Sequence, residues 1–464
     1  MSRPSADAPL ACALSFVALA CATGPPALLA SDGALDPTFG SGGAYEIGWN
    51  YGGSNDDFLR AVTADDGGNL YAVGYLTSEA TDFDWGIARV AADGSLLRHR
   101  LFFDAGGTND DEATAVALDG AAAILVAGTV ATADSTDLRL CRLATADLSL
   151  DPGFGSGGCA GYGLGPGEHF YPRVLARAAD HGILVAGTIV QPGTYGDPNP
   201  DFFVLKFTAN GGLDSSFGLF GIRVVSFDRS VNGDDELSGM AVDHQDRILL
   251  TGTVQWAADA SVTRAGVARL SPAGNLDVGF GYLGVFEFAA YPNDSTRGLA
   301  IAVDPAADSF EVSGAYNPSG SEWTGYLYFF GADGGVTWWA QMDWADPDHT
   351  DYARSVLRQC DAKILVAGDG EVGETYFASR LLADGTSLDG TFGGNGDTAY
   401  TPYHLGFYLG RGVASAALSD GRLVLGGDMY WGNRDWLLVR FQSGLMFCDG
   451  FDSGGPGKWS NFVP

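Results

Sequence analysis

The five residues Ile124-Leu125-Val126-Ala127-Gly128 decide the fold, because the chain repeats them. The same sequence recurs at Ile183–Gly187 and at Ile364–Gly368. Close variants lie at Leu70–Gly74, Ile248–Gly252, Phe310–Gly314 and Leu423–Gly427. The final glycines of successive copies are 54 to 65 residues apart, and such a regular period is the mark of a repeat architecture.

Around each copy the sequence predicts a unit of four short strands. A Leu-Asp-x-x-Phe-Gly phrase opens the unit at Leu35–Gly40, Leu150–Gly155, Leu213–Gly218, Leu276–Gly281 and Leu388–Gly393. A first strand, an acidic loop and a second strand follow. A tight turn such as Asp66-Gly67-Gly68-Asn69 then leads into the Ile-Leu-Val-Ala-Gly strand, since Asp-Gly and Asn supply the positive φ of hairpin turns. A fourth strand, such as Asp84–Val90, ends the unit.

Such units fit a β-propeller better than a β-solenoid, whose coils are usually far shorter. A single blade cannot bury a core, so the array should fold as one domain. We therefore expect an all-β chain: a seven-bladed β-propeller at residues 31–444, built from four-stranded repeats of about 59 residues. A signal peptide at 1–30 would precede it and a C-terminal tail at 445–464 would follow.

Three phrases in fixed order resemble the delta-60 repeat family of large bacterial exported proteins: the Leu-Asp-x-x-Phe-Gly opening, the Ile-Leu-Val-Ala-Gly strand after an Asp-Gly turn, and the ending of the fourth strand. The resemblance covers most of Leu35–Gly444 and implies a propeller-like fold, with no established activity. Unit five departs from the pattern, because Phe329 replaces the basic residue of the fourth strand. Phe447–Gly454, followed by Trp459, resembles a short DGFESG-like tail, which implies a sorting or processing tag; a frayed terminus is the alternative.

The N-terminal sequence and the overall charge predict an exported protein. Leu10–Ala22 is an uninterrupted run of apolar and small residues, as in the hydrophobic part of a signal peptide, and Cys21 leaves lipidation as an alternative. No later stretch is long and apolar enough to span a bilayer. The formal net charge of −32 disfavours nucleic acid and anionic membranes and favours a monomer. A periplasmic, cell-surface or extracellular location follows.

Cysteine spacing gives one candidate disulfide. Cys141 ends one repeat and Cys159 opens the next, and no two cysteines after the signal peptide have the spacing of a zinc site.

Acidic loops before the second strands are the best candidates for a metal site, with calcium as the candidate cofactor. Clustered carboxylates suit Ca²⁺, which takes six to eight oxygen ligands. The residues concerned are Asp56, Asp57, Asp110, Asp111, Asp234 and Asp235. The alternative is that these aspartates form turns by bonding their own backbone.

Aromatic residues concentrate in units five and six, where the repeat pattern breaks. Ligand-binding candidates there are Trp323, Tyr326, Trp338 and Trp339. Tyrosine and tryptophan dominate binding hot spots, but alternation along this stretch equally fits core packing.

Recurring basic residues indicate staples between blades, since a catalyst is needed only once. They start the second strands at Arg60, Arg173, Arg297, Arg354 and Arg411, and they lie in the fourth strands at Arg89, Arg142, Lys206, Arg269, Arg380 and Arg440. No zinc-protease or nucleophile-elbow motif is present, and the histidines His169, His349 and His404 only share a position before a second strand.

Two functions remain open. An enzyme would need polar residues converging from the first strands of the units, but these strands are mainly apolar or aromatic, as at Tyr45, Val224, Phe227 and Phe286. This favours a non-enzymatic binding or scaffold module for a protein or carbohydrate ligand. The alternative is a calcium-dependent propeller enzyme, hydrolase- or lactonase-like, with its site in a central channel.

Overall fold

The computed structural model describes residues 32–49, 56–79, 82–102, 110–192, 198–227, 233–256, 262–304, 306–318, 322–342, 344, 350–359, 361–370, 375–400, 408–409, 414–430 and 433–442. All of them belong to one unit, Ser31–Pro464. The expected signal peptide and tail lie outside the described residues, as do Cys21, Arg411, His349 and His404. No helix among the described residues is long and apolar enough to cross a membrane.

Consecutive strands pair antiparallel into four-stranded sheets, in chain order from the inner to the outer edge. One sheet is β2 (Asp57–Ala64), β3 (Leu70–Glu79), β4 (Asp82–Val90) and β5 (Leu96–Phe102). Another is β14 (Asp235–Val242), β15 (Ile248–Gln255), β16 (Thr263–Leu270) and β17 (Val285–Phe288). A third sheet is β18 (Ser295–Val303), β19 (Phe310–Asn317), β20 (Thr324–Phe330) and β21 (Val336–Met342). A fourth is β22 (Asp351–Arg358), β23 (Ile364–Gly370), β24 (Thr375–Leu381) and β25 (Asp397–Tyr400).

The eight-stranded sheet consists of two similar groups joined at one point. The first is β6 (Glu112–Leu118), β7 (Ala123–Ala131), β8 (Thr136–Ala144) and β9 (Cys159–Tyr162). The second is β10 (His169–Arg177), β11 (Ile183–Pro192), β12 (Pro198–Phe207) and β13 (Ile222–Val225). A single parallel pair, His169 opposite Thr136, joins β10 to β8.

The remaining sheet closes the ring, because it contains strands from both ends of the described chain. It consists of β26 (Tyr408–Leu409), β27 (Ala414–Ala417), β28 (Leu423–Tyr430), β29 (Arg434–Phe441) and β1 (Ala44–Ile47). β1 pairs antiparallel with β29, from Ala44 opposite Val439 to Ile47 opposite Trp436. β2 then packs against β27, β28 and β29, so the first and last sheets are neighbours.

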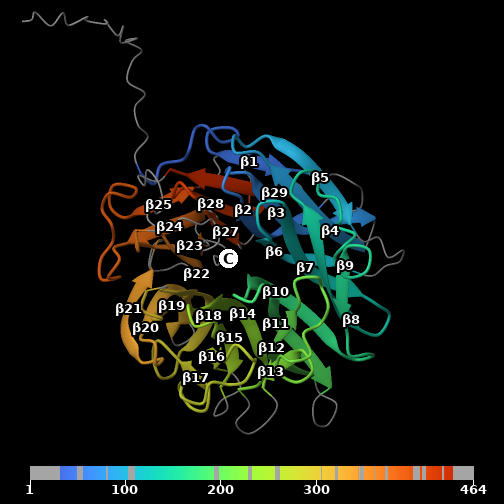
Figure 1. Cartoon of the computed structure of the whole chain (residues 1–464). Helices are drawn as coiled ribbons and strands as arrows, with labels where there is room; N and C mark the ends of the chain where they lie inside the picture. Colours follow the sequence, from blue (N-terminus) through green and yellow to red (C-terminus); the bar gives the residue numbers. More distant parts are fainter. Residues whose placement is uncertain are drawn as a thin grey trace, which may run out of the picture. The chain divides into compact units, whose positions relative to one another are not determined.

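The first strand of each group lies innermost, since it contacts the first strands of the groups on either side. β2 contacts β6, β6 contacts β10, and the series continues through β14, β18, β22 and β27 (Figure 1). Sheets that radiate in sequence order around an axis, with both ends of the chain in one sheet, are the arrangement of a β-propeller.

The sheet boundaries differ from the sequence units by one strand. The strand that opens each unit pairs with the fourth strand of the unit before it, as β9 does with β8 and β13 with β12. The opening phrase itself makes this connection. Its leucine bridges the last or next-to-last residue of that strand, for example Leu213 to Phe207 and Leu150 to Leu143. The phrase is therefore the turn between the third and fourth strands of a sheet.

Arginines of the fourth strands bond the next group and most of them hold these turns, which confirms the staple interpretation for the arginines. Lys206 pairs instead with Asp180 and Asp214 of its own group. Arg142 donates from Nε to Asp151 at 2.9 Å and from a terminal nitrogen to the Ala209 carbonyl, 2.9 Å away in the next group. Its guanidinium also lies 4.8 Å from the ring centre of buried Phe154. The same combination of Arg, Asp and Phe recurs at Arg269, Asp277, Phe280; Arg380, Asp389, Phe392; and Arg440, Asp36, Phe39.

Both faces of the second strand of each sheet are buried between neighbouring sheets, which explains its uninterrupted apolar sequence. In β3, Leu70 and Ala72 pack in the cluster that contains Trp436, whereas Tyr71 and Val73 pack in the cluster that contains Trp85.

The final glycine of this strand is required by its surroundings. A Cβ atom on Gly128 would overlap the carbonyl oxygen of Glu112 and lie 2.6 Å from Cζ2 of Trp85. At Gly74 the Phe58 carbonyl and Trp436, at 2.9 Å, occupy the corresponding places. The glycine thus admits the inner strand on one side and a large ring of the preceding sheet on the other.

We predict that Gly128→Ala lowers the free energy of unfolding by about 1–3 kcal/mol, because a methyl group is forced into a filled core. Urea unfolding monitored by tryptophan fluorescence measures the change. Gly390→Ala is the matched control, since a Cβ atom there meets nothing within 4 Å. Equal stability of the two variants would show that the glycine position is not sterically constrained.

Candidate functional site

Each described inner strand of four or more residues, except β27, carries a β-bulge opposite the final glycine of its neighbour. In β2 the pairing shifts between Leu59 and Ala61, so that Arg60 is the extra residue. Equivalent shifts occur in β6, β10, β14, β18 and β22. A bulge turns its side chains away from the regular alternation of the strand.

Charged side chains occupy the bulge, or the position two residues before it, in all six of these strands. They are Arg60, Glu112, Arg173, Glu236, Arg297 and Arg354, which we name the axial charge ring. All six are half-buried or exposed, in contrast to the buried residues that flank them. Positive and negative charges alternate over the first five positions, so polar groups from several sheets meet along the inner strands.

Four members from neighbouring sheets, Arg60, Glu112, Arg173 and Glu236, influence one another electrostatically. Burial and then the Arg60 guanidinium lower the pKa of Arg173, while Glu112, Glu236 and Tyr75 act in the opposite direction. Burial raises the pKa of Glu112, and Arg60 and Arg173 oppose this effect. The Arg173 side chain is nevertheless accessible to solvent, although many protein atoms surround it.

Aromatic side chains hold Arg60 in a fixed position. Its guanidinium donates to the Tyr75 hydroxyl at 2.7 Å and lies 4.7 Å from the centre of the same ring. Phe58 stacks on Tyr75 with ring centres 4.7 Å apart, and Arg434 lies 5.1 Å from the Phe58 ring.

A second aromatic group links the other end of the ring. Arg297 lies 4.2 Å from the Trp323 ring, which stacks on Tyr352 at 6.1 Å, and Arg354 lies 4.4 Å from the Tyr352 ring. Arg354 is also paired through two nitrogens with Asp369. Residues of β18, β22 and the segment before β20 therefore form one continuous stack.

Two interpretations from the sequence are wrong here. The arginines of the second strands were expected to staple blades, but Arg60 and Arg354 bond within their own sheets. The first strands of the units were expected to face the channel, but they are the outermost strands of the sheets. Their apolar character therefore says nothing about the axis. Glu112 and Glu236 were not among the predicted site residues, although each directly follows one of the acidic pairs, Asp110–Asp111 and Asp234–Asp235.

The calcium candidates are distributed over separate sheets. Asp57, Asp111 and Asp235 are buried, and each accepts a hydrogen bond from a backbone N–H, from Trp49 at 2.9 Å, Ala131 at 2.8 Å and Phe227 at 2.7 Å respectively. Asp110 and Asp234 are exposed, and half-buried Asp56 accepts from the Arg434 N–H at 2.9 Å. Within the part of the chain that the structure describes, no three acidic, histidine or cysteine side chains are grouped as metal ligands.

Buried carboxyl groups gather where the last sheet meets the first. Asp57 and Asp428 come from β2 and β28, and Asp435 lies in β29, beside Glu46 of β1. Asp428 accepts from the Leu59 N–H at 2.7 Å. Burial is the main cause that raises the pKa of each of the three aspartates to about 7, and the neighbouring carboxylates add to it at Asp57 and Asp435.

These shifts predict that the closed ring is less stable above neutral pH. Since the folded pKa exceeds the unfolded value of 3.8, the folded state holds more protons, and the free energy of unfolding falls as pH rises from about 4 through about 7. The pKa of Asp36 is lowered to about 2, so this group affects stability only below about pH 4.

Asp428→Asn should reduce that pH dependence and raise stability at pH 8 by about 1–3 kcal/mol, because it removes a buried charge and keeps an acceptor for Leu59. Urea unfolding at pH 5.5 and pH 8 measures both effects. Exposed Asp234→Asn serves as the control and should leave the difference unchanged. An unaltered pH dependence in Asp428→Asn would refute the assignment.

The aromatic candidates do not form one exposed site, although Tyr326 and Trp339 pack in the same apolar cluster. Trp323 joins the stack with Arg297 and Tyr352, whereas Tyr326 is completely buried and donates to the Arg297 carbonyl at 2.9 Å. Trp338 is exposed on β21, the outermost strand of its sheet, and Trp339 stacks on Tyr328 with ring centres 5.5 Å apart.

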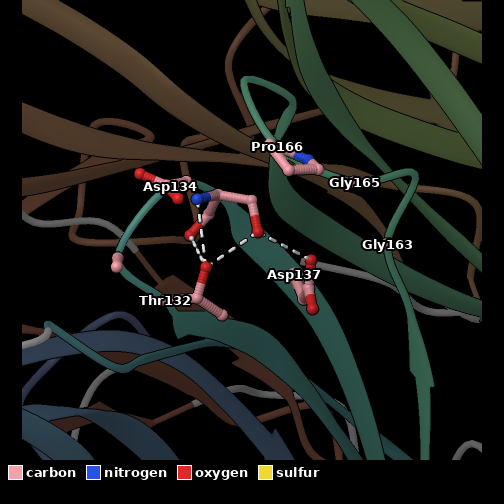
Figure 2. A pocket seen from close by; sticks show the side chains of 8 residues that line it. Thr132, Asp134, Asp137, Gly163, Gly165 and Pro166 are labelled. Atoms are coloured by element: carbon pink, nitrogen blue, oxygen red, sulfur yellow. Dashed lines mark hydrogen bonds between the residues drawn. The ribbon is translucent and has the colours of Figure 1, made fainter.

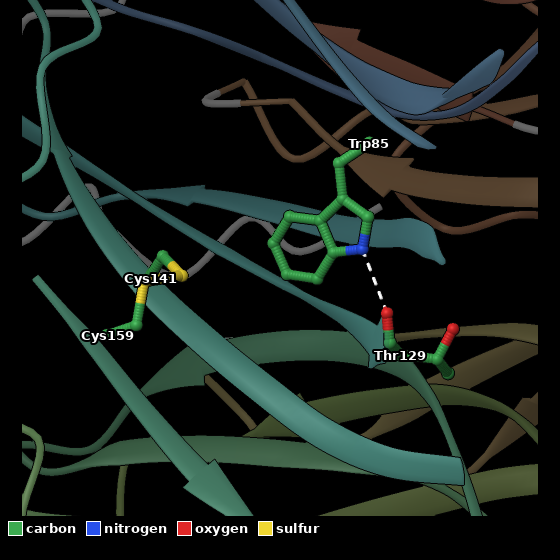
Figure 3. The surroundings of a disulfide bond; sticks show 4 residues. All are labelled: Trp85, Thr129, Cys141 and Cys159. Carbon is green, nitrogen blue, oxygen red and sulfur yellow. Dashed lines mark hydrogen bonds between the residues drawn. A yellow bond between two sulfur atoms is a disulfide. The ribbon is translucent and has the colours of Figure 1, made fainter. Parts of the chain in front are cut away.

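Cys141 and Cys159 are joined by a disulfide between the adjacent strands β8 and β9, where they are directly opposite each other. Figure 3 shows the bond and, nearby, Trp85, which donates from Nε1 to the Thr129 carbonyl at 2.9 Å. The disulfide thus fixes the outermost strand of its group.

A pocket of about 400 Å³ lies between the segments 132–137 and 163–166 (Figure 2). Its polar groups largely satisfy one another: Thr132 and Ser135 bond mutually, and the Ser135 hydroxyl donates to Asp137 at 3.3 Å.

Comparisons with known proteins support the fold. A family model described as a domain of unknown function (DUF5122) β-propeller matches residues 124–154 and 246–280. No curated protein is significantly similar to the chain. Among solved structures, the polysaccharide lyase Uly1 is 14% identical, with a TM-score of 0.50 over 82% of this chain and 89% of that one. The β-propeller domain of the trilobed protease from Pyrococcus furiosus is 11% identical, with a TM-score of 0.39 over 82% and 97%.

Proposed function

We propose that the chain is an exported binding module with its ligand site at the axial charge ring. In this proposal residues 1–30 direct export, and 445–464 act as a sorting or processing tag. Residues 31–444 fold as a monomeric propeller of seven blades, made by the strand groups β2–β5, β6–β9, β10–β13, β14–β17, β18–β21, β22–β25 and β26–β29 with β1. The delta-60 resemblance and the period of about 59 residues agree with this division.

The observation that carries the proposal is the convergence of unlike polar residues on the inner strands. The rest of the repeat is nearly equivalent from sheet to sheet. The charged residue of the inner strand, in contrast, is Arg60, Arg173 or Arg354 at the bulge in three sheets and Glu112, Glu236 or Arg297 two residues before it in three others. Structural residues repeat because each sheet needs them, but a ligand site is needed once. Places where a repeat varies its polar residues are therefore candidates for recognition.

An enzyme acting at the same place is the second candidate. Glu112 favours it, since a carboxyl group whose pKa burial raises can serve as a general acid beside Arg60 and Arg173. Incubation with acidic and neutral oligosaccharide libraries separates the two functions. We expect saturable binding without release of new chain ends; turnover abolished in Glu112→Gln would establish the enzyme instead.

The calcium-dependent form of the enzyme has its own test. We predict that millimolar calcium leaves the thermal unfolding midpoint within about one degree of its value in chelator, because Asp57, Asp111 and Asp235 already hold backbone N–H groups. A rise of several degrees, lost when Asp56, Asp110 and Asp234 are changed to Asn, would establish a calcium site and overturn this expectation.

A further inference from the structure

We propose that the axial charge ring takes the carboxylate or sulfate group of an acidic oligosaccharide, with Arg173 as its principal partner. The inference rests on the proposed function, because it names the ligand class of the same site.

The sign of the charge at the ring is opposite to that of the chain. The whole chain has a net charge of −32, yet the ring brings four arginines together with two glutamates. Asp369 neutralises Arg354, and burial disfavours the charged form of Glu112. Arg60, Arg173 and Arg297 therefore outnumber Glu112 and Glu236. An anion is the ligand that such a local excess attracts.

Arg173 is the member with the most to gain from an anion. It is the extra residue of the bulge in β10, it is exposed, and it makes no ion pair with any residue that the structure describes. Burial and the Arg60 charge both disfavour its guanidinium, as the lowered pKa shows. A carboxylate or sulfate bound through two parallel hydrogen bonds would offset both effects.

Two other arginines of the ring are positioned in advance. Arg60 is fixed by its bond of 2.7 Å to the Tyr75 hydroxyl, and Arg297 rests 4.2 Å from the Trp323 ring. Neither makes an ion pair with the described residues, so both guanidinium groups keep donors for a ligand. Side chains held by packing lose less entropy when they bind than mobile ones do.

An aromatic face beside Arg173 favours a sugar over a free inorganic anion. Tyr171 lies two residues before Arg173 on the same strand and is 41% exposed, with His169 stacked on it at 6.4 Å. An exposed tyrosine provides a flat apolar surface with a polar tip, which suits the face of a sugar ring. A charged group and a ring face next to each other match a sugar that carries a carboxylate or sulfate.

Isothermal titration of the mature full chain tests the inference. The probes are oligogalacturonate, a neutral cello-oligosaccharide, sodium sulfate and a polyglutamate peptide. We expect oligogalacturonate to bind, more weakly as salt is raised, and the other probes to bind at least tenfold more weakly. Arg173→Gln should weaken oligogalacturonate binding at least tenfold, and Tyr171→Ala should weaken it as well.

Arg98→Gln is the matched control, because Arg98 is exposed on the outermost strand β5. Its binding should equal that of the unmodified chain, and the unfolding midpoint of Arg173→Gln should stay within about one degree. Equal affinity for sulfate or polyglutamate would overturn the sugar class. Binding of the neutral oligosaccharide that Arg173→Gln leaves intact would overturn the anion site but keep the proposed function. Binding of no probe, in arrays of proteins and glycans as well, would overturn both.

Discussion

The inner strand of each sheet passes so close to a glycine of the adjacent strand that no side chain fits between them. At Gly128 the space that a Cβ atom would need is taken by the Glu112 carbonyl and the ring of Trp85. The same contact recurs at Gly74 with Phe58 and Trp436. This contact brings neighbouring sheets into register, and it coincides with the bulge that turns the inner strand toward the axis. The repeated glycine is therefore the link between the packing of the sheets and the residues displayed at the axis.

A second repeated contact lies near the outer edge of the sheets, at the turn that leads to the outermost strand. Arg440 bonds Asp36, lies 4.6 Å from the ring of Phe39 and reaches the carbonyl of Ala92 in the first sheet. Because Asp36 and Phe39 belong to the beginning of the described chain and Arg440 to its end, one side chain secures the closure. Arg440 and Asp36 are almost completely buried. Removing either side chain would therefore leave the other as an unpaired buried charge.

Electrostatics divides the acidic chain into regions of different character. Paired aspartates such as Asp36 and Asp389 keep lowered pKa values beside arginine or lysine partners, and they hold the turns. Asp57, Asp428 and Asp435 are buried with too little positive charge, so their pKa values are raised and the closure gains protons on folding. In the axial charge ring the balance reverses, with four arginines and two glutamates. Although the chain has a net charge of −32, the axial charge ring is locally positive.

The repeat, the all-β class and the propeller arrangement follow from the sequence alone, because strand periodicity and turn residues such as Asp66-Gly67 act over a few neighbours. The pairing of Cys141 with Cys159 was also accessible, since the two strands are adjacent in sequence. The sequence did not show which strand of a unit lies innermost. That depends on the bridge between Leu150 and Leu143. Through this bridge the strand that opens each sequence unit pairs with the sheet of the preceding unit. Consequently only the tertiary structure decided that Arg60, Glu112 and Arg173 meet at the axis, because residues of different sheets are brought together by ring closure and not by local spacing.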